Sequence, residues 1–179
     1  KPITTGCQLD GGGIVFGHSN GSVTEIHEGV CSTVSIGDSA IVAMDCRSGW
    51  VVGLDSGVVA TSKSLGSWNL ESLESIDVVS FGPSLDDNAG VWYSSWNGKG
   101  IIFLVGSSIG SVQLELSHGS RIVTCFANED TICFGDISGY IHIIEKEVLR
   151  RRFGMLPERE DDSGRASELR RKIRALRGA

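Results

Sequence analysis

Proline, paired cysteines and long apolar runs are all scarce in this chain. Only three of its 179 residues are proline. The longest apolar run, Gly100 to Gly106, is far too short to span a bilayer. No C-x-x-C pair occurs, so a zinc ribbon or a thioredoxin-type redox site has no support. No P-loop or G-x-G-x-x-G motif follows a predicted strand, and the sequence therefore gives no indication of nucleotide binding.

The five cysteines are odd in number and scattered. Cys46, Cys125 and Cys133 lie inside apolar runs, where a free thiol behaves as a small hydrophobic residue. This pattern is typical of reduced cysteines in a cytoplasmic or nuclear protein. We therefore predict that all five thiols are free and that the compartment is a reducing one.

Glycine, by contrast, is abundant, with 24 residues or about 13% of the chain, against roughly 7% in average proteins. The glycines follow no three-residue period, which excludes collagen, and the many Val, Ile, Leu and Phe residues exclude wholesale disorder. Glycine without a period and without proline marks tight turns between short strands. The composition therefore predicts an all-β domain with a core of its own.

The formal net charge of −6 combines two opposed parts. Residues 1–149 carry six Lys/Arg against 17 Asp/Glu, a net charge of −11, and residues 150–179 carry ten against five, a net charge of +5. We therefore divide the chain into an acidic body, residues 1–149, and a basic tail, residues 150–179. An acidic surface disfavours direct nucleic-acid binding by the body.

An internal repeat is the most informative feature of the body. Each unit has an apolar residue and a glycine, three further residues, a second glycine and then an alternating strand. The four glycine pairs are Gly17/Gly21, Gly53/Gly57, Gly106/Gly110 and Gly135/Gly139. The first glycines of successive pairs are 36, 53 and 29 residues apart. We expect an insertion near residues 65–73 or 85–89 in the longest interval.

We interpret each unit as a β-hairpin in which the second glycine supplies a positive φ in the turn. Apolar segments at residues 40–46, 76–81 and 122–126 precede the second, third and fourth hairpins. Each of these units thus has at least three strands. The mean spacing of about 39 residues is close to the ~40–45 residues of a four-stranded propeller blade.

These hairpins, with their Asp/Ser-Gly turns and following Val/Ile strands, resemble the WD-repeat β-propellers. The strand end Val79-Ser80-Phe81-Gly82-Pro83 also looks like the innermost strand of that family. No unit ends in Trp-Asp, and the Gly-His dipeptide is out of register, so the resemblance over residues 10–148 is to the broader propeller superfamily. It implies an all-β propeller of about four blades, which presents loops to protein partners.

About four blades leave ring closure open, because WD-type propellers usually close with about seven blades although four-bladed rings exist. The ring closes alone, or upstream blades are absent, or another protein completes it. Because the sequence starts in mid-blade without Met, we expect one of the last two arrangements. An unclosed set of blades would expose sheet edges and an apolar flank that need a cover.

A catalytic interpretation has little support. The segment 17–21 around Ser19 matches the G-x-S-x-G nucleophile elbow, but that motif requires a helix after the serine, whereas a strand pattern follows here. Residues 106–110 match the same pattern at a turn of the repeat. The preference of glycine and serine for turns therefore explains both matches. We predict a protein that is not an enzyme, and we keep a serine hydrolase using Ser19 or Ser39 as the alternative.

Metal and cofactor sites have no sequence support either. The histidines at positions 18, 27, 118 and 142 show no metal-ligand spacing. The segment Asp86-Asp87-Asn88 lacks the ordered ligands of an EF-hand. We therefore predict neither a metal site nor a bound cofactor.

The basic tail is the second informative region. We expect residues 150–152 to close the last strand, residues 157–164 to form a polar linker, and Ser167 to cap a short helix over residues 168–177. Such a short helix is marginal alone, so it either folds on a protein or RNA partner or stays a plain solvated helix. The residues predicted to contact the partner are Arg150, Arg151, Arg152, Arg170, Arg171, Lys172, Arg174 and Arg177.

We therefore expect a non-catalytic interaction scaffold, a WD-repeat-like propeller subunit of a larger multiprotein complex. Its expected partners are other protein subunits, one of which could complete the propeller. We expect no contact with a membrane. The alternative is a component of a ribonucleoprotein or ribosome-related assembly whose basic tail contacts RNA.

Overall fold

The computed structural model describes residues 1–47, 49–62, 69–71, 74–86, 88–106 and 112–154. Within these ranges the chain forms antiparallel strands and one short helix near the end. The elements are β1 (Ile3–Gln8), β2 (Ile14–His18), β3 (Ser22–His27), β4 (Val30–Ser35), β5 (Ile41–Asp45), β6 (Val51–Leu54), β7 (Val58–Thr61), β8 (Asn69–Glu71), β9 (Ile76–Gly82), β10 (Gly90–Trp96), β11 (Gly100–Gly106), β12 (Val112–His118), β13 (Ile122–Ala127), β14 (Thr131–Asp136), β15 (Ile141–Glu145) and α1 (Lys146–Phe153). The all-β fold class predicted from the glycine content is confirmed.

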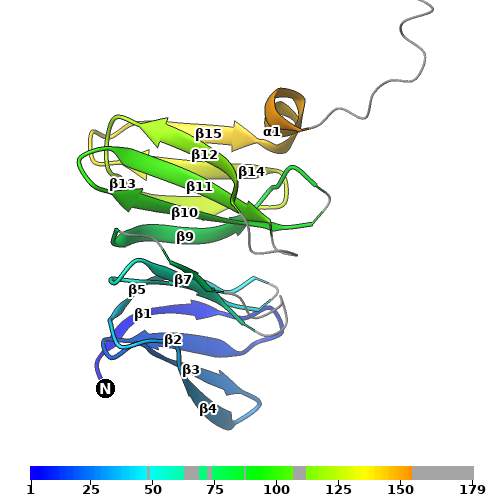
Figure 1. The fold of residues 1–179 in the computed structure, drawn as a ribbon. Coiled ribbons are helices and arrows are strands. Elements are labelled where there is room, and N and C mark those ends of the chain that lie inside the picture. Colours follow the sequence, from blue (N-terminus) through cyan, green and yellow to red (C-terminus); the bar gives the residue numbers. More distant parts are fainter. Residues whose placement is uncertain (48, 63–68, 72–73, 87, 107–111, 155–179) are drawn as a thin grey trace, which may run out of the picture.

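The strands form four sheets, which we call blades 1 to 4 in chain order. Blade 1 is β1-β2-β3-β4, blade 2 is β5-β6-β7-β8, blade 3 is β9-β10-β11-β12, and blade 4 is β13-β14-β15. The first strand of each blade is the innermost, because β1 packs on β5, β5 on β9 and β9 on β13. In Figure 1, β1, β5 and β9 lie near the middle of the molecule, and the outer strands β4 and β12 lie toward opposite ends.

Three apolar cores lie between the four blades, one at each junction. The first contains Val15 and Ile41, the second Val51 and Ile76, and the third Trp92. In the third core the Trp92 ring packs against the ring of Phe134, with centroids 5.9 Å apart. Among the described residues no fourth core joins blade 4 to blade 1. The four blades therefore form an open arc.

A half-buried arginine links the inner strands of three blades. Arg47 follows β5, and its Nη2 donates to Asp45 Oδ2 and to the Phe81 carbonyl, each at 2.9 Å. The same Asp45 oxygen accepts from the Ser80 hydroxyl and the Phe81 amide, each at 2.9 Å. Arg47 Nη1 donates to the Ala127 carbonyl at the end of β13. Hydrogen bonds to charged groups are the stronger ones, so this network fixes blades 2, 3 and 4 around one guanidinium.

The sheet register corrects the third unit of the predicted repeat. Gly21, Gly57 and Gly139 lie in the turns between the second and third strands of their blades, with φ of 72°, 90° and 86°. Gly106 instead ends the third strand of blade 3, and the equivalent turn is at Gly98, with φ of 92°.

The turn glycines thus recur at positions 21, 57, 98 and 139, with spacings of 36, 41 and 41 residues. The 53-residue interval in the sequence came from comparing different hairpins, so no insertion is needed to explain it. Gly110 lies outside the described residues.

Two cysteines differ from the prediction. Cys7 on β1 and Cys46 after β5 form a disulfide, with their Cα atoms 5.8 Å apart, which joins blade 1 to blade 2. The prediction that all five thiols are free is therefore wrong for this pair. The odd number of cysteines and the separation of 39 residues gave no indication of the pairing. Cys31, Cys125 and Cys133 are free. The pairing removes the cysteine argument for a reducing compartment, and the compartment stays a prediction.

The arginines at the end of the body lie in a helix and not in a strand. Strand β15 ends at Glu145, and Arg150, Arg151 and Arg152 form the last turn of α1, where cations suit the helix dipole. Leu149 of α1 is buried in the core between blades 3 and 4, so packing holds this segment helical. Within the described ranges no helix is long and apolar enough to cross a membrane.

The predicted linker and the helix at residues 168–177 lie outside the described residues. The same holds for the remaining basic residues of the tail, which are Arg170, Arg171, Lys172, Arg174 and Arg177.

We predict that two turn glycines respond differently to alanine. Both have positive φ, but an added Cβ on Gly139 meets no atom within 4 Å, whereas one on Gly21 would overlap the Gly37 carbonyl. Gly139→Ala should lower the free energy of unfolding by about 1–2 kcal/mol, and Gly21→Ala by clearly more. Gly119→Ala, at an open position without positive φ, is the control and should change it by less than about 0.5 kcal/mol. Urea unfolding measures all three, and equal losses for Gly21→Ala and Gly139→Ala would contradict the steric argument.

Candidate functional site

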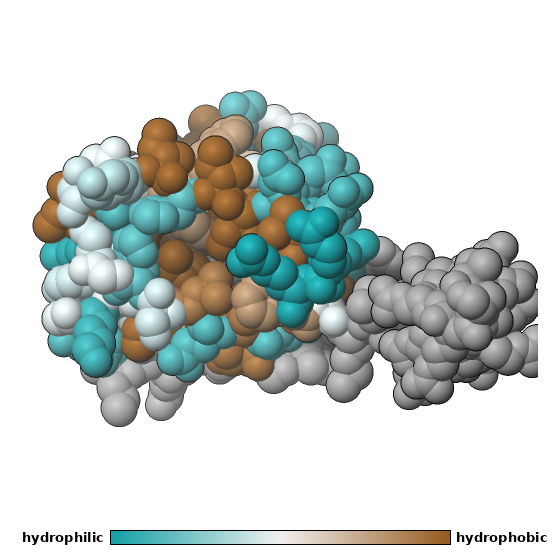
Figure 2. Space-filling view, turned by 90° about the horizontal axis from the view of Figure 1, so that it is seen from above, coloured by the Kyte–Doolittle hydropathy of each residue, from teal (hydrophilic) through white to brown (hydrophobic). Residues whose placement is uncertain are grey.

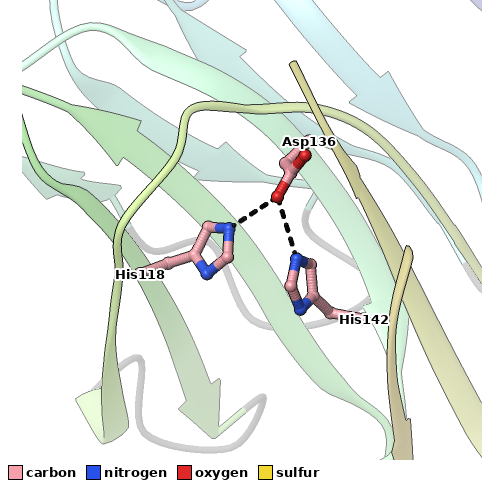
Figure 3. Close-up of side chains that lie close together, drawn as sticks. All are labelled: His118, Asp136 and His142. Carbon is pink, nitrogen blue, oxygen red and sulfur yellow. Dashed lines mark hydrogen bonds and ion pairs between the residues drawn. The ribbon is translucent and has the colours of Figure 1, made fainter. Parts of the chain in front are cut away.

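A cluster of two imidazoles and a carboxylate lies between blades 3 and 4. His118 ends β12 of blade 3, Asp136 ends β14, and His142 lies on β15 (Figure 3). Asp136 Oδ2 is 3.1 Å from His118 Nε2 and 3.0 Å from His142 Nε2. The Asp136 side chain is 1% exposed, against 18% for His118 and 36% for His142. The cluster is thus closed behind the carboxylate and open to solvent beside His142.

The β14–β15 turn holds the carboxylate of Asp136 in place. Its second oxygen, Oδ1, accepts the backbone N–H groups of Ser138 at 2.8 Å and Tyr140 at 3.1 Å. This leaves Oδ2 directed at the two imidazoles, as Figure 3 shows. The hydrogen bond from His142 does most to lower the pKa of Asp136 to about 2, and those from Tyr140, His118 and Ser138 add to it against the effect of burial. The ionised form of Asp136 is therefore strongly favoured.

The same positions carry other residues in the other blades. By strand register, Asp136 and His142 of blade 4 occupy the positions that are equivalent to His18 and Thr24 of blade 1. There His18 Nε2 and Thr24 Oγ1 are 2.8 Å apart. Blades 1 and 4 thus both have a polar pair at this position. In blade 4 the pair includes the carboxylate of Asp136, and His118 of blade 3 joins it. The sequence analysis missed the cluster because His118 and His142 come from different blades, 24 residues apart.

One repeated contact builds the blade junctions. The inner strands all begin with isoleucine, namely Ile3, Ile41, Ile76 and Ile122, and each isoleucine is followed by a shift in register. Near the end of each second strand stands a small residue, which is Gly17, Gly53, Ser94 or Gly135 in blades 1 to 4.

The isoleucine of one blade fills the space left by the glycine of the preceding blade. A Cβ on Gly17 would lie 2.7 Å from Ile41 Cγ2, and a Cβ on Gly53 would lie 2.5 Å from Ile76 Cγ2. Real Cβ atoms do not approach other heavy atoms so closely, since interiors are already close-packed. We call this space the glycine gap. It explains the first glycine of the pairs Gly17/Gly21 and Gly53/Gly57, whereas the second glycine of each serves the turn.

Both halves of this contact are unmatched at the ends of the arc. Among the described residues, a Cβ on Gly135 of blade 4 would meet within 4 Å only Thr124 Cγ2 of its own blade, at 2.7 Å. Ile3 of blade 1 is 59% exposed, although Ile41 and Ile122 are 0% and 1% exposed. Within the described part of the chain, the arc therefore carries an exposed isoleucine at one end and an unfilled glycine gap at the other.

The outer face of blade 4, which surrounds this gap, is apolar. Ile141 pairs with Gly135 in the sheet and is 72% exposed, whereas Val23 and Val59, which pair with Gly17 and Gly53, are 2% and 0% exposed. On the same face, Phe126 and Ile143 are 72% and 62% exposed. Figure 2, seen from above, shows apolar side chains gathered at the end of the molecule formed by blades 3 and 4. A patch of this kind on a soluble domain is typical of an interaction site.

The two serines of the hydrolase alternative lie in turns. Ser19 lies between β2 and β3, so a strand and not a helix follows it, and its amide donates to the Pro2 carbonyl at 3.1 Å. Ser39 Oγ donates to Ser56 Oγ at 2.8 Å. These surroundings are those of turn residues, as the sequence predicts.

Solved structures of other proteins share this fold. The computationally designed protein Ika4 matches with a TM-score of 0.65 and 15% identity over 81% of this chain and 91% of its own. BBS1N, solved in complex with ARL6DN, matches with a TM-score of 0.65 and 14% identity over 85% of this chain. Sqt1 of Saccharomyces cerevisiae matches with a TM-score of 0.64 and 15% identity over 80% of this chain. No family model and no curated protein matches the chain.

These likenesses define the fold class as an all-β, propeller-like arrangement of blades. The matches cover 53% of the BBS1N chain and 45% of the Sqt1 chain, so this chain spans about half the length of either. At 14–15% identity, the likeness extends to the fold alone.

The lowered pKa of Asp136 predicts how stability depends on pH. Because its pKa is about 2 in the folded chain and 3.8 ordinarily, the carboxylate contributes stability that is present above pH 3.8 and is lost as the pH falls toward 2. Asp136→Asn should therefore be less stable than the parent chain at about pH 6, and the difference should shrink near pH 2.5. Urea unfolding at both pH values measures it, with the exposed Asp130→Asn as the control for net charge. A difference that stays constant over this range would contradict the assignment.

Proposed function

We propose that this chain is a non-catalytic interaction scaffold, a WD-repeat-like propeller subunit whose ring is completed by another protein subunit in a larger complex. One observation carries the proposal, namely that the arc ends in a free Ile3 and an empty glycine gap at Gly135. Because the two ends of the arc are complementary, a further blade can join either end through the same isoleucine–glycine contact.

The chemistry of the open face favours another β-blade as the partner. At each junction inside the arc, a face of this type is covered by a blade whose inner strand begins with isoleucine. Burying a side chain such as Ile141, Ile143 or Phe126 contributes roughly 1.5–3 kcal/mol. An apolar sheet face with a gap for one branched side chain suits another β-blade. It does not suit nucleic acid, because the protein surfaces that bind nucleic acid are basic.

A second copy of the chain meets this requirement. It carries Ile3 for the gap at Gly135 and a gap for the first chain's Ile3, so two arcs of four blades arranged head to tail would give a ring of eight. Propellers close with about four to eight blades. Among the designed proteins that share the fold, the match covers 91% of the Ika4 chain but 45% of the Ika8 chain, so one is about as long as this arc and the other about twice as long.

We predict that the 179-residue chain self-associates through these ends. Light scattering after size exclusion, at tens of micromolar, should give twice the chain mass of 19.1 kDa. Ile3→Asp should yield monomers because it places a charge in the gap, and Gly135→Val should do so because it fills the gap. Ile141→Lys tests the same face without touching the gap. Val30→Asp, at an exposed position on β4, is the matched control and should remain a dimer.

Mixing the variants tests the head-to-tail arrangement itself. Ile3→Asp retains the gap and Gly135→Val retains the isoleucine, so a mixed pair regains one of its two junctions. The mixture should therefore associate more strongly than either variant alone. A monomeric parent chain, or a dimer that survives all three variants, would overturn the proposal.

A further inference from the structure

We propose that His118, Asp136 and His142 form a binding site for one divalent transition-metal ion, with Zn²⁺ as the reference ion. The inference is independent of ring completion, because the cluster lies between blades 3 and 4 inside the arc. It rests on the ligand types, on their convergence and on the way the fold orients them.

The ligand atoms lie at separations that suit such an ion. A tetrahedral ion with bonds of about 2.0–2.1 Å places its ligand atoms about 3.3–3.4 Å apart. Here Asp136 Oδ2 lies 3.1 Å and 3.0 Å from the two Nε2 atoms, and one ligand atom from each of the three residues lies within 4.8 Å of the other two. Widening these two carboxylate–imidazole separations by a few tenths of an ångström brings them to the tetrahedral value, and two imidazoles with one carboxylate are ligands that zinc accepts.

The fold holds the carboxylate ready to bind. The Ser138 and Tyr140 amides occupy Asp136 Oδ1, so Oδ2 faces the imidazoles without further rearrangement. Hydrogen bonds of this kind to a ligand's remote atom commonly orient metal ligands. When the ion binds, each imidazole carries its proton on Nδ1 in place of Nε2.

The open side of the cluster provides a path for the ion. His142 is 36% exposed, so a water molecule can occupy the fourth position, as in sites with three protein ligands. The body around the cluster carries a net charge of −11 over residues 1–149, which attracts cations. A bound ion would link His118 of blade 3 to the two ligands of blade 4, in the manner of a cross-link between blades.

Zinc titration tests the site directly. We expect isothermal calorimetry with ZnCl₂ to show one ion bound per chain. His142→Gln should weaken binding by more than about tenfold, because the loss of a ligand exceeds the 10–100-fold effect of an outer hydrogen bond. His118→Gln should do the same, whereas His27→Gln, at an exposed histidine on β3, should bind like the parent chain. Asp136 is left intact because the turn amides depend on it.

Two further measurements keep the result unambiguous. Thermal unfolding with zinc should show a higher melting temperature for the parent chain and a smaller shift for His142→Gln, since the ion binds the folded state. The spectrum of the Co²⁺ form should lack thiolate-to-metal charge transfer, which separates this site from the free thiols of Cys31, Cys125 and Cys133. No binding at one equivalent, or binding that His142→Gln and His118→Gln leave unchanged in folded chains, would overturn the proposal.

Discussion

The insertion of one isoleucine into a glycine gap determines how blade 1 meets blade 2 and how blade 2 meets blade 3. Gly17 and Gly53 leave room for Ile41 and Ile76, whose side chains would collide with any Cβ at those positions. The contact lies beside the apolar cores, where interiors tolerate neither overlap nor empty space. It therefore fixes the approach of the inner strands, and with it the course of the arc. The same contact makes the two ends of the arc complementary, because one retains its isoleucine and the other its glycine.

The fold class could be predicted from sequence because turns and strands are local. Glycine at the turns and alternation after them depend on a few neighbouring residues. The third unit was misassigned because Gly106 and Gly110 reproduce the spacing of the other pairs, while the Asn97-Gly98 dipeptide, a strong hairpin signal, was overlooked. The shared isoleucines escaped notice for another reason. Their equivalence depends on a register shift after each one, and register shows only when the strands are paired.

The candidate site depends on contacts between blades, which no local pattern contains. His118 belongs to one sheet and Asp136 to the next, so the spacing rules for metal ligands on a single hairpin or helix do not apply to them. The disulfide between Cys7 and Cys46 was missed for the same reason. The two cysteines are 39 residues apart, which is about one repeat. A search at that spacing, and not at short spacings, would have found the disulfide pair.

Blade 4 shows why polar contacts concentrate at one junction. It is described with three strands and is supported by a single apolar core, whereas blades 2 and 3 each lie between two. Contacts of charged side chains also attach it to blades 2 and 3. Arg47 reaches the Ala127 carbonyl, Arg121 Nη2 lies 2.6 Å from Asp77 Oδ1, and His118 reaches Asp136. Such contacts are directional, so they specify the position of a blade that packing holds from one side only. Covering the outer face would add a second apolar junction to these contacts and to the core that blade 4 shares with blade 3.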